Sequence, residues 1–426
     1  MDPKRRTRRD FLQNITIVLL SLSAVFLFTQ TQLYSLGVDA GSDYLRYLGG
    51  AQTSAVSETA ALTSLSAPVR LAVTGVYGGR YGSVAGTTTD EVFEPVGGLL
   101  REALRSVQSL TPCEPQEFLR ALEGTSIYFD FLEPLPLPVL AGLVGASLES
   151  GVSARRLVIS AQGAGEAVLY LWDGEEDCRR STTAVSEAEL ESVVGGYELN
   201  GASFALDGGT GPESARMDPC SLFPLEPPAL PVLSSAAVLP DSATLLTALG
   251  FYPRTNSRYT ESGGVEVVTD GDRTLRLSPD GSIRYRSGGD PAITIAAAGE
   301  DPTVTEAVMG VSALLNNLLT TQESGAGLYL LGVRETESTQ VLSFGWQSGG
   351  VPIRLDRGGA AAEVTLSGNV VSMLTLRFRQ YADTGELSLL LPLRQALAIA
   401  ARQEGAELSI GYVDDGATAS ASWLAD

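Results

Sequence analysis

Hydrophobic and polar residues alternate along the segment from Asn256 to Arg286, which reads NSRYTESGGVEVVTDGDRTLRLSPDGSIRYR. An alternation with a period of two predicts β-strands that bury one face only. Gly, Asp and Pro at residues 263–264, 270–272 and 279–281 are residue types that form tight turns. The segment therefore predicts a three-stranded meander with a polar outer face. Its apolar positions are Val265, Val267, Leu275, Leu277, Ile283 and Tyr285.

The chain before this meander predicts a mixed unit in which helices and strands are segregated. No βαβ repeat is visible, so the pattern indicates an α+β fold rather than a parallel sheet. The strand segments are 69–76, 126–132, 154–161 and 167–174, and the helical segments are 87–107, 115–124, 186–196 and a short helix after Pro138.

The C-terminal part predicts an antiparallel sheet with helices on one face. Six prolines between Pro212 and Pro231 indicate an extended connector before it. A helical segment at 241–251 precedes the meander. The C-terminal part has helical segments at 301–321 and 388–403, and strand segments at 327–335, 340–355, 363–381 and a final hairpin at 407–424.

The first 34 residues predict a membrane anchor. Five basic residues stand within residues 1–10, and residues 11–33 carry no charge, which is enough chain for a helix to cross a bilayer. Clustered arginines on the N-terminal side place the N-terminus in the cytoplasm and the bulk of the chain outside. The apolar residues that define the anchor are Ile15, Leu19, Leu22, Val25 and Phe28.

Two other interpretations of this N-terminal segment remain open. A cleavable signal would need small residues close behind the apolar core, and Val38-Asp39-Ala40 lies far from Phe28. The run TRRDFLQ at Thr7 matches the twin-arginine export pattern, which would release a soluble binding protein. We favour an uncleaved anchor, because the segment is strongly apolar and lacks a nearby cleavage site.

These patterns divide the chain into seven parts. They are a cytoplasmic tip at 1–10, a transmembrane helix at 11–34, a tether at 35–67, an N-terminal α+β domain at 68–210, a Pro-rich connector at 211–233, a middle domain with the meander at 234–300 and a C-terminal α+β domain at 301–426.

The composition excludes several classes of function. The net charge is -21, so the surface repels nucleic acid. The chain has no histidine and a single lysine, Lys4, which excludes Ser-His-Asp, Cys-His and Schiff-base catalysis and most zinc sites. We therefore expect no cofactor and no metal. A hydrolase that uses paired carboxylates remains the enzymatic alternative, although the acids at 173–177 and at Asp270 and Asp272 have the pattern of turns.

The three cysteines, Cys113, Cys178 and Cys220, allow at most one internal disulfide and leave its pairing open. Their spacing fits no zinc site. Burial as small apolar side chains is the alternative interpretation.

Several segments resemble the YycH/YycI family, also called WalH/WalI, and the N-terminal unit favours the YycH branch. The resemblance covers most of the chain outside the anchor through loose patterns. It departs from the family at Ser422, where a proline is usual. The segments are the basic tip with its single span, IYFDFLEPLPLPVL at Ile127, the meander, FGWQSGGVPIRL at Phe344 and LSIGYVDDGATASASWLAD at Leu408.

The resemblance implies a regulatory protein without enzymatic activity. Members of this family are anchored in the membrane and adjust a WalK-type sensor histidine kinase, together with a sister YycI-like protein. For this chain it implies those two partners and a membrane contact through one helix.

The meander also offers a candidate protein interface, because arginine and tyrosine are the residue types that dominate binding hot spots. The alternative is a solvated strand face without a partner. We expect the core of the last sheet to contain Trp346, Tyr412 and Trp423. The candidate interface residues are Tyr252, Arg258, Tyr259, Arg273, Arg276, Arg284 and Tyr285, with Arg286 on the same meander.

Overall fold

The fold is taken from a computed structural model, which describes residues 67–426 apart from residues 210, 253–255, 289–292, 296–298, 300, 320–323 and 357. Within these residues no helix combines the length and the hydropathy needed to cross a membrane. The predicted span at 11–34, with Ile15, Leu19, Leu22, Val25 and Phe28, lies outside the described residues. The described residues, from Ala67 onward, belong to one compact unit.

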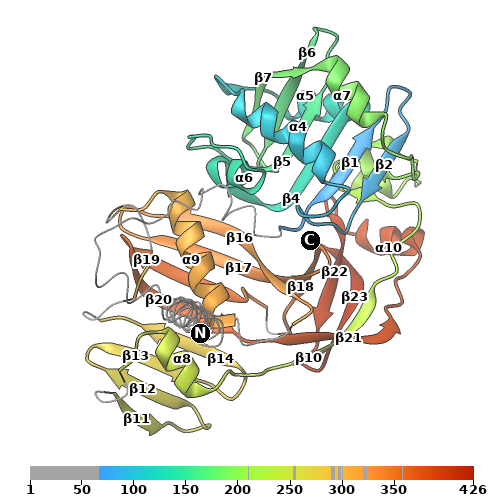
Figure 1. The fold of residues 1–426 in the computed structure, drawn as a ribbon. Helices are drawn as coiled ribbons and strands as arrows, with labels where there is room; N and C mark the ends of the chain where they lie inside the picture. Colours follow the sequence, from blue (N-terminus) through green and yellow to red (C-terminus); the bar gives the residue numbers. More distant parts are fainter. Residues whose placement is uncertain are drawn as a thin grey trace, which may run out of the picture. The chain divides into compact units, whose positions relative to one another are not determined.

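A seven-stranded antiparallel sheet forms the first half of this unit, in the order β2-β1-β4-β5-β6-β7-β3 (Figure 1). Helices α4 and α7 pack on one face with α6, and α5 packs on the other face, with Phe118 and Leu122 against Tyr128 and Val158. We expected helices on one face only. The alternation of Ile127 and Phe129 with Tyr128 makes both faces of β4 apolar, so both faces need a cover.

Strands β1, β4, β5 and β6 and helices α5 and α7 lie where the sequence predicts them, whereas β2, β3 and β7 were not predicted and α4 begins seven residues later than expected. The bounds are β1 (Arg70–Thr74), β2 (Arg80–Ser83), α4 (Glu94–Arg105), β3 (Thr111–Pro112), α5 (Pro115–Glu123), β4 (Ser126–Pro136), α6 (Leu137–Leu143), β5 (Ser153–Ser160), β6 (Glu166–Trp172), β7 (Cys178–Ser186) and α7 (Glu187–Val194).

The predicted connector, 211–233, is more ordered than its prolines suggest. A small two-stranded sheet of β8 (Ser203–Phe204) and β9 (Leu222–Phe223) follows the first sheet, with the short 3-10 helices η1 (Ala205–Asp207) and η2 (Ser214–Arg216). Met217, Cys220 and Phe223 are buried. The prolines exclude a long helix here, but they do not prevent packing.

A second sheet of 14 strands forms the other half, and it includes the meander. Its main path runs β11-β12-β13-β14-β20-β19-β17-β18-β22-β23-β10-β21, and one pair in it, β18 with β22, is parallel. The predicted middle and C-terminal domains therefore share one sheet. Its strands are β10 (Pro231–Ala236), β11 (Ser257–Thr260), β12 (Glu266–Asp270), β13 (Arg273–Leu277), β14 (Ser282–Arg286), β15 (Ile293–Thr294), β16 (Gly327–Glu335), β17 (Gln340–Ser348), β18 (Val351–Arg354), β19 (Ala362–Ser367), β20 (Val370–Arg377), β21 (Gln380–Leu387), β22 (Leu408–Asp414) and β23 (Thr418–Ala425).

Helices cover one face of this sheet over the meander. Helix α8 (Ser242–Ala248) and helix α9 (Val304–Leu319) bury their apolar residues in the same cluster as Leu275, Ile283 and Leu374. Helix α10 (Leu393–Ala400) packs instead in a separate small cluster with Phe223 and Leu408. The expected core aromatics Trp346 and Tyr412 are buried, and Trp423 is partly buried.

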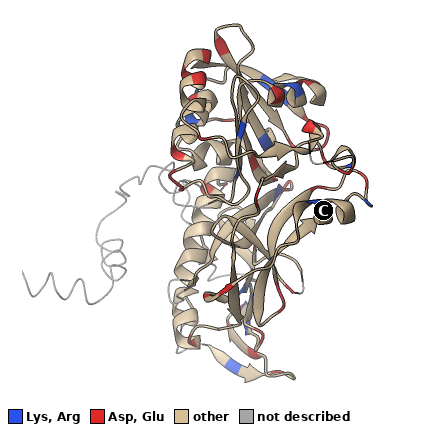
Figure 2. Ribbon diagram, turned by 90° about the vertical axis from the view of Figure 1, so that its right-hand side faces the viewer, with Lys and Arg blue, Asp and Glu red and all other residues tan. Residues whose placement is uncertain are grey.

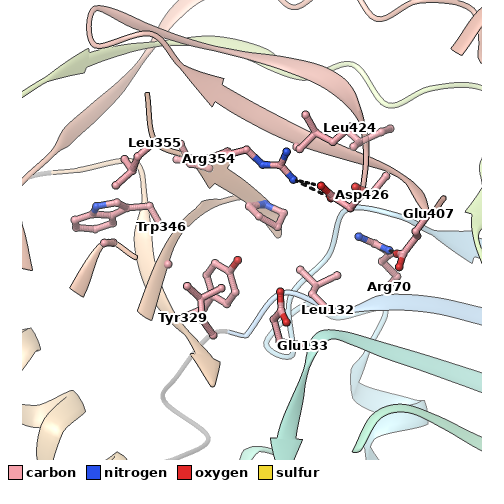
Figure 3. A pocket seen from close by; sticks show the side chains of 18 of the residues that line it. Arg70, Leu132, Glu133, Tyr329, Trp346, Arg354, Leu355, Glu407, Leu424 and Asp426 are labelled. Carbon is pink, nitrogen blue, oxygen red and sulfur yellow. Dashed lines mark hydrogen bonds and ion pairs between the residues drawn. The ribbon is translucent and has the colours of Figure 1, made fainter. Parts of the chain in front are cut away.

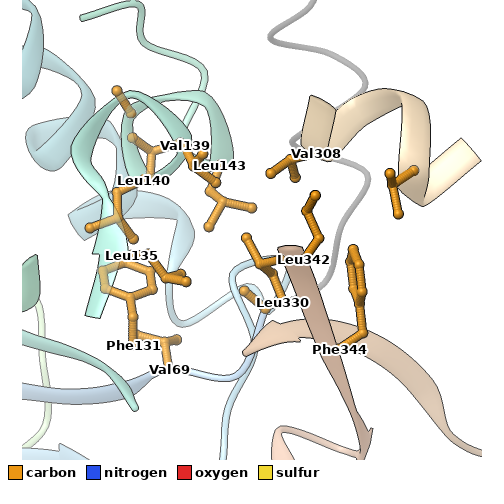
Figure 4. Close-up of a cluster of buried hydrophobic side chains, with 14 of the residues drawn as sticks. Val69, Phe131, Leu135, Val139, Leu140, Leu143, Val308, Leu330, Leu342 and Phe344 are labelled. Carbon is orange, nitrogen blue, oxygen red and sulfur yellow. The ribbon is translucent and has the colours of Figure 1, made fainter. Parts of the chain in front are cut away.

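One hydrophobic cluster joins the two sheets. Figure 4 shows Leu140 and Leu143 of α6 facing Val308 of α9, with Leu330 and Leu342 of the second sheet below them. The same cluster extends through both sheets, so the halves are not separated by solvent-exposed linkers. The sheet-rich α+β architecture matches the predicted class, while the predicted boundaries do not correspond to separate cores.

The meander has four strands in place of the three predicted, because Ser257–Thr260 pairs with Glu266–Thr269 as β11. The residue of β12 that faces the helices is Val268, opposite Leu275. Val267 is buried, as predicted, but lies opposite Arg276 on the other face, and Val265 is half-buried. Leu275, Leu277, Ile283 and Tyr285 are buried as predicted.

Candidate functional site

The outer face of the meander collects the exposed arginines that the sequence singled out. Tyr259, Val267, Arg276, Arg284 and Thr375 lie opposite one another across five neighbouring strands. Because side chains alternate along a strand, they point away from α8 and α9. We call this surface the arginine face and define it by Tyr259, Arg276, Arg284, Arg286, Thr375 and Arg377.

Two shallow hollows run along the arginine face. One, of about 490 Å³, is lined by Tyr259, Arg276 and Arg286 among others. The other, of about 380 Å³, is lined by Arg377 and Arg379, together with Asp280 and Asp356. Both hollows share Arg284 and Thr375, so they form one continuous concave surface.

Charge on this face is only partly balanced. Arg276 pairs with Glu261 at 3.2 Å, and both side chains are largely exposed. Arg377 donates to the carbonyl of Gly358 at 2.5 Å. Arg284 and Arg286 are exposed and form no ion pair or hydrogen bond with the residues that the structure describes. Figure 2 shows a basic segment on a strand of the meander, and acidic and basic residues on loops, helices and strands elsewhere, in a chain with a net charge of -21.

Two of the predicted interface residues lie in the interior. Tyr285 is 1% exposed and packs edge to face on Phe251, and Arg273 is 2% exposed. Arg273 binds Asp270 at 2.7 Å, donates to the carbonyl of Gly250 at 3.0 Å and lies over the ring of Phe251. Arg273 thus ties the hairpin to the end of α8, and neither residue belongs to an interface.

The remaining predicted residues lie apart from the arginine face. Arg258 is opposite Val268 and points to the other side of the edge strand, where it pairs with Glu266 at 3.5 Å. Tyr252 is 60% exposed and follows α8. The structure therefore brings together Tyr259, Arg276 and Arg284 from the predicted set and adds Arg377 from β20.

A second feature is a buried cluster of charges that the sequence analysis did not identify. Asp130 of β4 binds Arg155 of β5 at 2.8 Å and Arg70 of β1 at 3.2 Å. Glu407, which directly precedes β22, binds Arg70, Arg155 at 2.7 Å and Arg156 at 3.1 Å. The cluster therefore connects the first sheet to the second through ion pairs between residues distant in sequence.

A cavity of about 340 Å³ adjoins this cluster, and Figure 3 shows Tyr329, Glu133 and the Arg354–Asp426 pair around it. Leu132 at its edge has a φ of +72°, and its N–H donates to Asp130 at 2.8 Å. No other non-glycine residue of the described chain has a positive φ. The buried carboxylate stabilises this strained backbone.

The acids at this cavity are poorly suited to paired-carboxylate hydrolysis. Burial raises the pKa of Glu133, which would suit a general acid. However, the arginines around Asp130 and Glu407 hold the pKa of both carboxyls below their usual values, and their oxygens are occupied by guanidinium groups. The arrangement stabilises the fold, and Asp426, the remaining acid that lines the cavity, pairs with Arg354 at 2.6 Å.

The acids singled out at 173–177 form a turn, as predicted: Asp173 accepts from Glu175 N–H at 2.8 Å and from Asp177 N–H at 3.2 Å. The described residues contain no group of three or more Cys, Asp or Glu residues that could hold a metal ion.

Comparisons with protein-family models, with curated proteins and with solved structures found no match to this chain. Its function must therefore be argued from its own surface.

Proposed function

We propose that this chain is a membrane-anchored regulatory protein without enzymatic activity, which binds a sensor histidine kinase, or a sister accessory protein of that kinase, outside the cytoplasm. The proposal joins three lines of argument: the apolar N-terminal segment, the resemblance to the YycH/YycI family and the arginine face.

The observation that carries the binding role is the unpaired charge on the arginine face. A guanidinium group binds a carboxylate through two parallel hydrogen bonds, and arginine is the cation of choice at interfaces. Arg284 and Arg286 have no such partner among the described residues, and Tyr259 and Met373, 51% and 39% exposed, add apolar contact area beside them. The occupant that fits is an acidic segment of a partner protein.

Arg276 can exchange its ion pair with Glu261 for an ion pair with a carboxylate of a partner protein. Its two side chains are about half and one third exposed, so water already competes for both charges. A partner carboxylate can replace Glu261 at small cost, because exposed pairs of this kind contribute little to folding. Binding should therefore weaken as salt is added.

Co-purification from membranes tests this proposal. The full-length chain with Arg276, Arg284 and Arg286 changed to alanine should retain less than a tenth of the kinase or sister protein that the unchanged chain retains. A control with Arg120, Arg258 and Arg402 changed to alanine removes the same charge from exposed positions elsewhere and should retain it fully.

Equal retention by both variants would refute the arginine face as the partner surface. Binding of the unchanged chain to vesicles of anionic lipid, without any retained protein, would show instead that the face holds lipid headgroups. An intact chain found free in the cytosol would contradict the membrane anchor.

A further inference from the structure

Two cysteines distant in sequence meet in the first sheet. Cys113 follows β3 and directly precedes the N-cap of α5, and Cys178 is the first residue of β7. Their Sγ atoms lie 2.7 Å apart, although 65 positions separate them in the chain. The third cysteine, Cys220, is buried, and within the described residues its sulfur forms no hydrogen bond with either of them.

The backbone holds this pair in register. Thr111 lies opposite Arg180 and Pro112 opposite Arg179, so Cys113 continues the antiparallel pairing opposite Cys178. The N–H of Cys113 donates to the carbonyl of Cys178 at 2.9 Å. Residues directly opposite in an antiparallel pair have Cα atoms about 4.5–5.5 Å apart, within the range of about 4.4–6.8 Å that a disulfide requires.

We propose that Cys113 and Cys178 form a disulfide in the mature protein and that Cys220 remains a thiol. This inference does not depend on the proposed partner. A disulfide persists in an oxidising compartment, which is where the anchor would place this part of the chain.

The reaction is an exchange with a disulfide oxidant, such as oxidised glutathione or a protein disulfide. Cys113 is partly exposed, whereas Cys178 is buried, so the Cys113 thiolate attacks the oxidant first and forms a mixed disulfide. The Cys178 thiolate then attacks the Cys113 sulfur and releases the remaining thiol of the oxidant. Two thiol protons are lost, and the two electrons reduce the oxidant to its thiols.

Burial raises the pKa of the Cys113 and Cys178 thiols. Both groups are thus mainly protonated at neutral pH, and the exchange should become faster as the pH rises. A small fraction of thiolate is typical of a structural disulfide, which forms once. A catalytic disulfide, which is repeatedly reduced and oxidised, needs a larger fraction.

The test uses purified full-length protein, reduced and then incubated with oxidised glutathione. Alkylation in denaturant should label three thiols before oxidation and only Cys220 after it, with a loss of about 2 Da in mass when the disulfide forms. Peptide mapping should link Cys113 to Cys178. Reduction should lower the melting temperature by about 5 °C.

Single variants separate this bond from its alternatives. Cys220→Ser should keep the bond and leave no thiol to label, whereas Cys113→Ser should leave two. A link that includes Cys220, or separate glutathione adducts on Cys113 and Cys178 without an internal bond, would overturn the proposal.

Discussion

Asp130 connects two arginines of the charge cluster to the backbone of Leu132. It is 1% exposed, accepts from Arg70 and Arg155 and also holds the strained backbone of Leu132. Breaking a buried ion pair leaves an uncompensated charge, and that cost exceeds the net value of the pair itself. The cluster therefore matters for stability mainly when one member is removed.

The free energy of unfolding should decrease in acid, because the carboxylates of this cluster become protonated. The pKa values of Asp130 and Glu407 are depressed from ordinary values of 3.8 and 4.5. A depressed folded-state pKa adds stability above the unfolded-state pKa, and that stability is lost as the pH falls through the folded-state value. The urea midpoint should thus decrease steadily below about pH 4.5.

Asp130→Asn tests the source of this acid sensitivity. The change should lower the free energy of unfolding at pH 7 by about 3–5 kcal/mol and flatten the decrease in acid, measured by urea titration between pH 7 and pH 3. An unchanged pH profile in this variant would show that other carboxyls cause the acid loss.

Arg273 and Arg284 stand on neighbouring strands of the same meander but have different environments. Arg273→Ala removes the ion pair with Asp270 and the donor to Gly250, so we expect a loss of about 3 kcal/mol in the free energy of unfolding. Arg284→Ala should leave the urea midpoint unchanged, because Arg284 is exposed and unpaired among the described residues. Equal effects of the two changes would contradict the burial that we describe.

The alternation along β13 and β14 distinguishes these two arginines, but the sequence analysis assigned both to the candidate interface because of their residue type. Alternation predicted the buried positions Leu275 and Ile283 correctly, because they repeat every second residue within their own strands. Arg273 is the first residue of β13 and lies in the same alternation as the buried Leu275 and Leu277, so the pattern places it on the buried face. Its partners at the end of α8 could not be predicted from this pattern. The contacts of the charge cluster could not be predicted from the sequence either, since Arg70 and Glu407 are 337 positions apart.

At the scale of elements, the strands that the sequence missed are those without an apolar alternation. β21 has six consecutive exposed residues from Ala382 to Leu387 and pairs only with β10. Its edge position is stabilised by the neighbouring strand β10, which begins at Pro231. Helices α5, α8 and α9 were located well, because N-cap signals and helical periodicity are local.

The turn between β17 and β18 lies close to the backbone of Gly86, and this contact can be tested by substitution. Gly350 has a φ of +77°, and a Cβ there would collide with the backbone of Gly86 in the first half of the unit. Gly349 has a φ of +54° and open space around it. Gly349→Ala should cost about 1 kcal/mol in the free energy of unfolding, from backbone strain alone.

Gly350→Ala should cost at least about 2 kcal/mol more than this control, because it adds the collision to the strain. Thermal and urea unfolding of the two variants, measured side by side, give the comparison. Similar losses for both would mean that the turn does not pack against Gly86.

At the scale of the whole molecule, the two sheets should unfold together, because one hydrophobic cluster contains residues of both. Leu330→Ala removes a buried side chain at the junction in Figure 4. We expect a loss of about 2–4 kcal/mol. Hydrogen exchange should accelerate in β5 as well as in β20.

Leu397→Ala is a matched control, since Leu397 is fully buried in the separate α10 cluster. Its effect on exchange should stay near α10 and β22. Acceleration in only one sheet after Leu330→Ala would show that the two sheets are stabilised independently.

The most direct test of the proposed function is site-specific photo-crosslinking in intact cells. A photoreactive residue at position 284, in the full-length chain, should form a crosslink to the sensor kinase or its sister protein, and the same residue at position 258 should not. Both positions are exposed on the meander but point to opposite sides of it. No crosslink from position 284 to either membrane protein, or equal crosslinks from both positions, would contradict the account.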